Sequence, residues 1–226
     1  MAAIQRPNQK DLSDSDWDDF INAINSMHGV RARAPAYRAF VNLHVEAMSM
    51  SGMSWGVHSM PSMGMGGTNF LAWHRQFLYS FEKRLGIPIP YWNWIDDSDI
   101  PSRLNDKTLL RRWSVTRRWN PIEMPTEDQL KSQIRPKTFS VFQRSLELGA
   151  HAAVHIAIGG NMNSPSSPTD PIFFLHHANI DRIWSEWQKK NKSNPRNRSE
   201  VLQRPPIEGV KVSSVLNISS LGYSYV

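Results

Sequence analysis

The chain has 226 residues, a formal net charge of +6, eight histidines, ten methionines and no cysteine. This length is enough for one domain with a sizeable core, which we expect to span residues 1–226. The absence of cysteine excludes disulfide frameworks, zinc fingers, iron–sulfur clusters, blue-copper sites and thiol nucleophiles, so any metal must bind to histidine, carboxylate or methionine.

The charge and hydropathy patterns indicate a soluble protein. Most of the positive excess falls in residues 103–118 and 189–204, and neither segment resembles a nucleic-acid-binding module, so we interpret both as solvated surface and expect no nucleic-acid partner. No apolar run reaches the roughly 18 to 20 residues needed to cross a membrane. Residues 1–8 have no hydrophobic stretch of the signal-peptide kind, which predicts a cytoplasmic protein, with export by a partner or a removed leader as the alternative.

Hydrophobic residues recur with helical spacing in five segments. Ser13 and Asp16 form a capping-box pattern at the start of the first. The fourth is expected to be interrupted around Gly149, and Pro171 marks the start of the fifth. The predicted helices cover, in chain order, about residues 13–24, 36–47, 70–81, 138–158 and 171–187.

The segments between these helices are irregular. Residues 48–67 are rich in Gly, Ser and Met and predict a loop, which carries His58. Residues 96–136 are polar, basic and broken by proline, typical of a long surface excursion with one short helix. The tail, residues 201–226, alternates weakly and predicts short strands or a covering segment.

Five histidines lie on the apolar stripes of four predicted helices. One such histidine is more often an ordinary core residue than a metal ligand. Several imidazoles buried independently would each need a polar partner, at a cost of about 1–3 kcal/mol where none is found. A shared metal centre accounts for all of them together: His44, His74, His151, His155 and His177.

The spacing of the histidines restricts the kind of metal site. His151 and His155 are four residues apart, which places them on one helical face about 6 Å apart in rise. The glutamate that directly follows the first histidine in zinc proteases is absent, and Glu147 precedes His151 by four residues instead of the three of di-iron bundles. Imidazole suits copper, zinc, nickel or iron, and the chain offers more histidines than one ion takes. Six histidines divided between two ions, without a carboxylate, best fit two coppers that together deliver two electrons to dioxygen.

Two long motifs resemble the copper signatures of tyrosinases and catechol oxidases. The first is FLAWHRQFLYSFE at residues 70–82, followed by PYWNW at 90–94. The second is DPIFFLHHANIDRIW at residues 170–184. The pair His151 and His155, followed by two glycines at 159–160, resembles its usual companion. The resemblance extends from about Arg6 to the closing GYSY of residues 222–225.

This resemblance implies a ligand set. Of the adjacent histidines at 176 and 177, the family pattern makes His177 the ligand. Helical geometry agrees, because His177 shares a face with Ile180 and Trp184. His176 is then a residue that supports the ligands or the core, and His28 is a surface residue. Because the chain lacks cysteine, His58 cannot form the thioether that some relatives have. The implied ligands are His44, His58 and His74 for one copper and His151, His155 and His177 for the other.

Four further residues have implied roles beside the metals. Asn179 and Asp181 are expected to fix the last helix and its ligand, the alternative being local bonding to Arg182 or the backbone. Glu147 is a candidate for the glutamate that holds a water near the second copper. Ala152 stands where strongly hydroxylating tyrosinases often carry asparagine, so we expect weaker monophenol hydroxylation and an entrance open to bulky substrates.

The resemblance implies a mainly α-helical fold, an antiparallel four-helix bundle enclosing a dinuclear copper centre, with long loops, minor β structure and no covering C-terminal domain. The expected activity is oxidation of small phenols by dioxygen to o-quinones, as an o-diphenol oxidase with some monophenol ortho-hydroxylation. The alternatives are an o-aminophenol oxidase and a hemocyanin-like reversible oxygen carrier. The sequence leaves open the oligomeric state and a copper-delivery partner.

The methionines cluster around His58, with six between Met48 and Met65. Thioethers prefer Cu(I), so this loop is a candidate for copper loading. The alternative is that flexible methionine side chains fill an irregular surface or line the substrate entrance.

Overall fold

The computed structural model describes residues 3–29, 36–49, 57–58, 68–202 and 209–226, which form a mainly helical structure. The methionine-rich loop lies almost entirely outside the described residues, so neither role predicted for it is tested. The elements are β1 (Ile4–Arg6), α1 (Asp14–Met27), α2 (Ala36–Ser49), α3 (Phe70–Leu85), α4 (Lys107–Arg112), α5 (Glu127–Ile134), α6 (Phe139–Leu146), α7 (Ala152–Ile158), α8 (Ile172–Lys190) and β2 (Tyr223–Tyr225).

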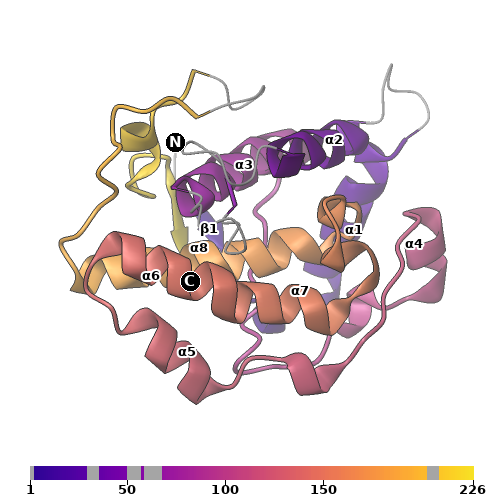
Figure 1. The fold of residues 1–226 in the computed structure, drawn as a ribbon. Coiled ribbons are helices and arrows are strands. Elements are labelled where there is room, and N and C mark those ends of the chain that lie inside the picture. Colours follow the sequence, from indigo (N-terminus) through magenta and orange to yellow (C-terminus); the bar gives the residue numbers. More distant parts are fainter. Residues whose placement is uncertain (1–2, 30–35, 50–56, 59–67, 203–208) are drawn as a thin grey trace.

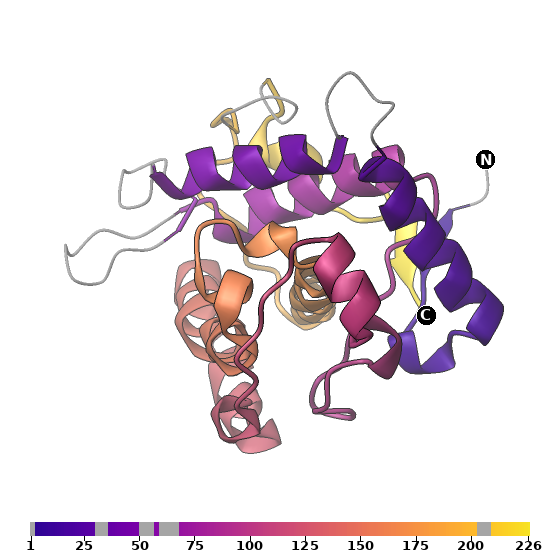
Figure 2. The ribbon, with the colours of Figure 1, turned by 90° about the vertical axis from the view of Figure 1, so that its right-hand side faces the viewer.

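Two antiparallel pairs of helices surround the centre of the molecule. Helices α2 and α3 lie side by side above α6, α7 and α8 (Figure 1). In the view turned by 90°, the pair of α2 and α3 is seen from the side, whereas the pair of α7 and α8 is seen nearly end-on (Figure 2). The two pairs therefore cross. The mainly α-helical bundle that the sequence predicts is confirmed, and the single-domain assignment of residues 1–226 stays a prediction.

Local sequence signals explain where the long helices begin, bend and end. Ser13 and Asp16 form the predicted capping box at the start of α1. Gly86 ends α3 in the left-handed region, with a φ of +83°, which favours glycine. Gly149 interrupts the helix between α6 and α7 with non-helical backbone angles, as predicted, inside a π-helical turn over Glu147–His151.

The excursion over residues 96–136 is more helical than predicted, because it contains two short α-helices instead of one. Asp106 starts α4 by accepting hydrogen bonds from the backbone N–H groups of Thr108 and Leu109. Thr126 starts α5 through a capping box with Gln129. Both helix starts are visible in the sequence as cap residues. Each helix, however, has too few apolar residues to show a helical periodicity.

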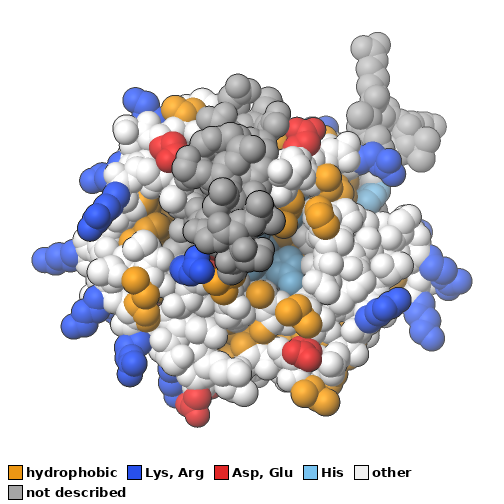
Figure 3. Space-filling model, viewed as in Figure 1, with side chains coloured by type: hydrophobic (Ala, Val, Ile, Leu, Met, Phe, Trp, Pro, Cys, Tyr) orange, Lys and Arg blue, Asp and Glu red, His pale blue; other side chains and the backbone are white. Residues whose placement is uncertain are grey.

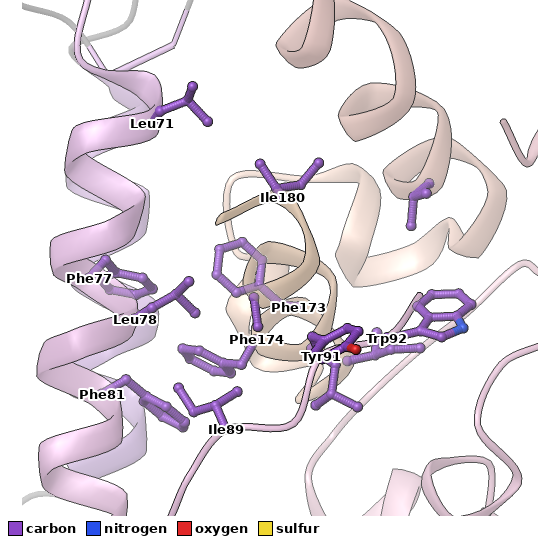
Figure 4. Packing of buried hydrophobic residues seen from close by; sticks show 14 of the residues in the cluster. Leu71, Phe77, Leu78, Phe81, Ile89, Tyr91, Trp92, Phe173, Phe174 and Ile180 are labelled. Atoms are coloured by element: carbon purple, nitrogen blue, oxygen red, sulfur yellow. The ribbon is translucent and has the colours of Figure 1, made fainter. Parts of the chain in front are cut away.

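Aromatic side chains fill the contact between α3 and α8. Figure 4 shows side chains of α3 directed toward Phe173, Phe174 and Ile180 of α8. The rings of Phe81 and Phe174 stack with centroids 3.5 Å apart, and Phe77 packs beside them. This rigid contact holds the two helices that carry His74 and His177.

A buried polar network joins both ends of the chain to α3 and α8. Strand β1 at the N-terminal end, which the sequence did not predict, pairs in parallel with β2. The carboxylate of Asp181 accepts hydrogen bonds from Arg75 Nε at 2.5 Å and from the hydroxyls of Tyr223 and Tyr225 at 2.7 and 2.6 Å. Arg6 stacks on Tyr223 and forms a bidentate pair with Glu82. The last helix is thereby tied to the two terminal strands.

Within the described ranges, no helix combines the length and the apolar character needed to span a membrane.

Candidate metal centre

Three histidines from different parts of the chain form the first group. His44 lies on α2, His74 on α3, and His58 in the two-residue segment described between them. Each offers a ring nitrogen within 4.8 Å of the others, and all three are buried. The structure therefore brings together the three residues implied as ligands of one copper, including His58, which no helical stripe predicts.

The second group contains four histidines. His151 and His155 come from the π-helical turn and α7, and His176 and His177 from the first half of α8. Each offers a ring nitrogen within 4.8 Å of the others. The two groups face each other, because the rings of His74 and His177 stack with centroids 4.3 Å apart. The structure thus brings all six implied ligands to one place, with His176 as a seventh histidine.

Backbone carbonyls fix the orientation of four of the rings. The Nδ1 atoms of His44 and His74 lie 2.7 and 2.8 Å from the carbonyl oxygens of Pro165 and Phe70. Those of His151 and His155 lie 3.0 and 2.5 Å from the carbonyl oxygens of Glu147 and Met162. A carbonyl can only accept, so each Nδ1 donates its proton and Nε2 keeps a free lone pair.

The free nitrogens fit a pair of metal ions. Among the described residues, Nε2 of His44, His58, His74, His151 and His176 is buried without a hydrogen-bond partner. Nε2 of His155 instead faces Nε2 of His177 at 3.3 Å. Buried polar atoms left without partners are costly unless something binds them. Convergent neutral imidazole nitrogens suit copper, so the histidines present fit a pair of copper ions.

Burial keeps five of the six implied ligands uncharged at neutral pH, namely His44, His74, His151, His155 and His177. It lowers the pKa of His44 to about 3, with a further contribution from nearby His58, and lowers the pKa of His155 to about 4. Burial also lowers the pKa of His74, His151 and His177 well below the usual range, with neighbouring histidines adding to the effect. A metal ion can therefore bind without first displacing protons from these rings.

The depressed pKa values predict that the metal-free protein is sensitive to acid. Between the ordinary histidine pKa of about 6.5 and the folded values for His44 and His155, the unfolded chain binds more protons than the folded one. The free energy of unfolding should therefore fall as pH decreases through this range, by up to about 1.4 kcal/mol per pH unit for each group. Urea unfolding of the metal-free protein at pH 7.5, 6.0 and 5.0 measures this slope. His44→Gln should make it shallower, and a flat profile would contradict the prediction.

Asn179 and Asp181 act elsewhere than on the histidine rings. Asn179 Oδ1 accepts a hydrogen bond from Arg182 Nε at 2.9 Å, the local alternative considered from the sequence. Asp181 does fix the last helix, but through Arg75 and two tyrosines instead of through a ligand. Burial raises its pKa, and the neighbouring Arg75 and Arg6 together with the tyrosine hydroxyls lower it more, so the net direction is downward.

Glu147 and Ala152 lie at the edges of the second group. The carboxylate of Glu147 is buried, with Oε1 3.5 Å from Nδ1 of His58. It therefore touches the ligand implied for the first copper, while its own backbone carbonyl orients His151. Ala152 directly follows His151 as the first residue of α7 and is partly exposed.

His28 differs from the surface residue that the sequence predicts. It is half-buried at the C-terminal end of α1, and its ring stacks on Tyr37 with centroids 4.1 Å apart and faces Trp113. Burial lowers the pKa of its ring. This packing could not be predicted from a local pattern, because Tyr37 lies on α2 and Trp113 at the end of α4, outside the helix that His28 ends.

The sequence did not predict the roles of two kinds of residue at the site. Pro165 and Met162 orient the rings of His44 and His155 through their backbone carbonyls, which carry no side-chain signal. Trp94 donates a hydrogen bond from Nε1 to Nδ1 of His176 at 3.2 Å. Its motif was visible, but a contact across 82 residues was not.

The family follows from comparison with known proteins. The common central domain of tyrosinase matches this chain over residues 34–112 and 104–190, which together include every histidine of the two groups. The chain belongs to the tyrosinase family. Tyrosinase-family proteins are oxidoreductases that bind two copper ions and use dioxygen, and the histidine groups fit that cofactor.

Related sequences and structures include tyrosinases and a hemocyanin unit. The tyrosinase of Streptomyces antibioticus is 28% identical over 84% of this chain and 85% of its own length. A functional unit of octopus hemocyanin has a TM-score of 0.72 at 22% identity, covering 99% of this chain and 68% of that one. Latent apple tyrosinase has a TM-score of 0.68 at 20% identity, and this chain spans 63% of its length. These structures share the fold of this tyrosinase-family chain.

Proposed function

We propose that this tyrosinase-family protein oxidises o-diphenols to o-quinones with dioxygen, and that ortho-hydroxylation of monophenols is a weaker second activity. The observation that carries the proposal is the pair of facing histidine groups, whose buried nitrogens converge on one place. We assign His44, His58 and His74 to one copper and His151, His155 and His177 to the other.

The residues of the chain hold the site rigid and dry. When bound, the two coppers supply the redox chemistry, in which two o-diphenols give four electrons and four protons to one dioxygen and leave as two o-quinones with two waters. Phe173 packs against His44 and His177, at 5.1 and 4.1 Å between ring centroids. Phe70 packs against His74 and His151 in the same way. These rings exclude water and restrict the rotation of the imidazoles.

The substrate is expected to enter beside the start of α7. His155 and Ala152 are partly exposed there, whereas His151 and His177 are buried. On the face shown in Figure 3, histidine side chains are visible between hydrophobic ones. A flat aromatic ring can pack against such a surface and present its hydroxyls to the metals. The small side chain of Ala152 favours substrates with bulky substituents.

Glu147 is the candidate proton acceptor of the site. Its buried carboxylate lies beside His58 and one helical turn before His151. A phenol with a pKa near 10 must lose a proton before it can react at the metals, and a carboxylate acting directly or through one water can take it. We propose this role for Glu147 together with the orientation of His58.

Oxygen consumption tests the proposal. The copper-loaded protein is supplied with a monophenol, with the matching o-diphenol and with the matching o-aminophenol, and quinone formation is followed by absorbance. We expect the o-diphenol to be oxidised fastest. Faster turnover of the o-aminophenol would favour the aminophenol oxidase, and reversible oxygen binding without quinone would identify a carrier. If none of the three substrates is oxidised, the proposed oxidase activity is wrong.

Ala152→Asn tests the substrate side of the same site. An amide next to His151 can hold a water that receives the phenol proton, so the ratio of monophenol to o-diphenol turnover should rise about tenfold. The control is Ala153→Asn, at the next and also partly exposed position of α7, which should leave the ratio unchanged. An equal response of both variants would show that proximity to His151 is not the cause.

A further inference from the structure

The second group contains one histidine too many. Each of its four members offers a ring nitrogen within 4.8 Å of the others, and His176 and His177 are both fully buried on consecutive positions of α8. A copper held by three imidazoles must take one of this adjacent pair and leave the other. Distance does not decide which of the two binds copper, so another property of the two rings must decide it.

Trp94 distinguishes the two rings. Its indole Nε1 lies 3.2 Å from Nδ1 of His176, and both side chains are fully buried. An indole N–H can only donate, so Nδ1 of His176 must accept. A neutral imidazole whose Nδ1 accepts carries its proton on Nε2. One nitrogen of His176 is therefore occupied by Trp94 and the other by a proton, and neither has a lone pair free for a metal.

Four of the other rings have the opposite arrangement. His44, His74, His151 and His155 place Nδ1 against carbonyl oxygens, which puts the proton on Nδ1 and frees Nε2. Nδ1 of His177 has no hydrogen-bond partner among the described residues. Nε2 of His177 donates to Nε2 of His155, whose own proton is on Nδ1. Because Nδ1 of His177 is unpartnered in the described part of the chain, this proton can move there when a metal binds Nε2, whereas Nδ1 of His176 is already held by the indole N–H.

The position of Trp94 is fixed by the backbone. The segment that carries it is hydrogen-bonded to the start of α8, because the N–H of Trp92 donates to the carbonyl of Leu175 at 3.1 Å. Leu175 directly precedes His176, so the indole is held in register with that ring. The N–H of Trp94 also donates to the carbonyl of Trp92 at 3.0 Å, which closes a tight turn.

We propose that Trp94 is a positioning residue that keeps copper off His176 and so gives the third ligand position of the second group to His177. This inference rests on the copper site proposed above. It makes the indole N–H, through the proton position it imposes, the feature that selects between two adjacent histidines.

The proton positions can be read directly in the metal-free protein. Long-range proton–nitrogen correlation spectra of protein carrying nitrogen-15 histidine distinguish the two neutral tautomers. We expect the proton of His176 on Nε2 and those of His44, His74, His151 and His155 on Nδ1. A His176 proton on Nδ1 would overturn the proposal. This measurement uses the unaltered sequence, so it decides even where a variant fails to fold.

Copper binding tests the selection itself. His177→Ala should bind one copper per chain, and adding Trp94→Phe should restore the second, at least tenfold more tightly than in His177→Ala alone, since His176 is released. The control adds Trp92→Phe instead, which removes a neighbouring buried indole whose Nε1 bonds to the carbonyl of Asp97. If Trp94→Phe restores no more copper than Trp92→Phe, the proposal is wrong. Failure of the unaltered protein to bind two coppers would instead refute the copper site.

Discussion

His74→Ala should reduce the bound copper from two ions to one per chain and lower o-diphenol oxidation by at least about a thousandfold. His74 belongs to the first group, and its ring stacks on His177 of the second, so it lies where the two groups meet. Groups that act as a unit lose their activity together when one is removed. Metal analysis of the purified variant and oxygen uptake with an o-diphenol measure the two effects.

The matched control for this loss is His28→Ala. His28 is a half-buried histidine whose ring stacks on Tyr37, outside both groups. It should retain two coppers, with a modest loss of thermal stability from the missing ring contact. Two coppers and normal turnover in His74→Ala would remove that residue from the ligand set.

Asp181→Asn should lower the free energy of unfolding by about 3–5 kcal/mol, because it leaves buried Arg75 without its charged partner. The carboxylate is 3% exposed and accepts hydrogen bonds from Arg75 and from two tyrosine hydroxyls. For a chain of this size the loss corresponds to a fall in Tm of roughly 6–20 °C. Thermal unfolding of the metal-free and copper-loaded forms measures it.

Glu186→Gln on the same helix provides the comparison. Glu186 forms an ion pair with Arg182 but is about half exposed. Solvent-exposed pairs of this kind contribute about 0.5 kcal/mol or less, so this variant should unfold close to the unaltered protein. Similar losses in both variants would mean that helix charge, and not the buried network, explains the effect.

Much of the helical scaffold and most of the candidate site could be predicted because both depend on local periodicity. The histidines on apolar stripes are brought together by the helices that carry them, as with His74 on α3 and His177 on α8. The orientation of His74 and His151 by carbonyls four residues earlier is also a local property of a helix. The position of His58 depended on the family resemblance alone, since its loop has no period.

The contacts that escaped prediction join residues far apart in the chain. The family resemblance leads us to expect that Asp181 fixes the last helix and its ligand, yet its carboxylate accepts hydrogen bonds from Arg75 and the two terminal tyrosines. The hydrogen bond from Trp94 to His176 joins side chains 82 positions apart. Such pairings depend on tertiary packing, which no window of neighbouring residues records.

The pairing of β1 with β2 bears on when the metal centre can form. Arg6 and Tyr225 are 219 positions apart and are hydrogen-bonded to each other, and both reach Asp181 on the helix that carries His177. Closing so long a loop costs entropy before any contact repays it, and folds with distant pairings assemble slowly. The packing of the helix that carries His177 depends on this distant pairing, so the second histidine group is expected to be completed late in folding.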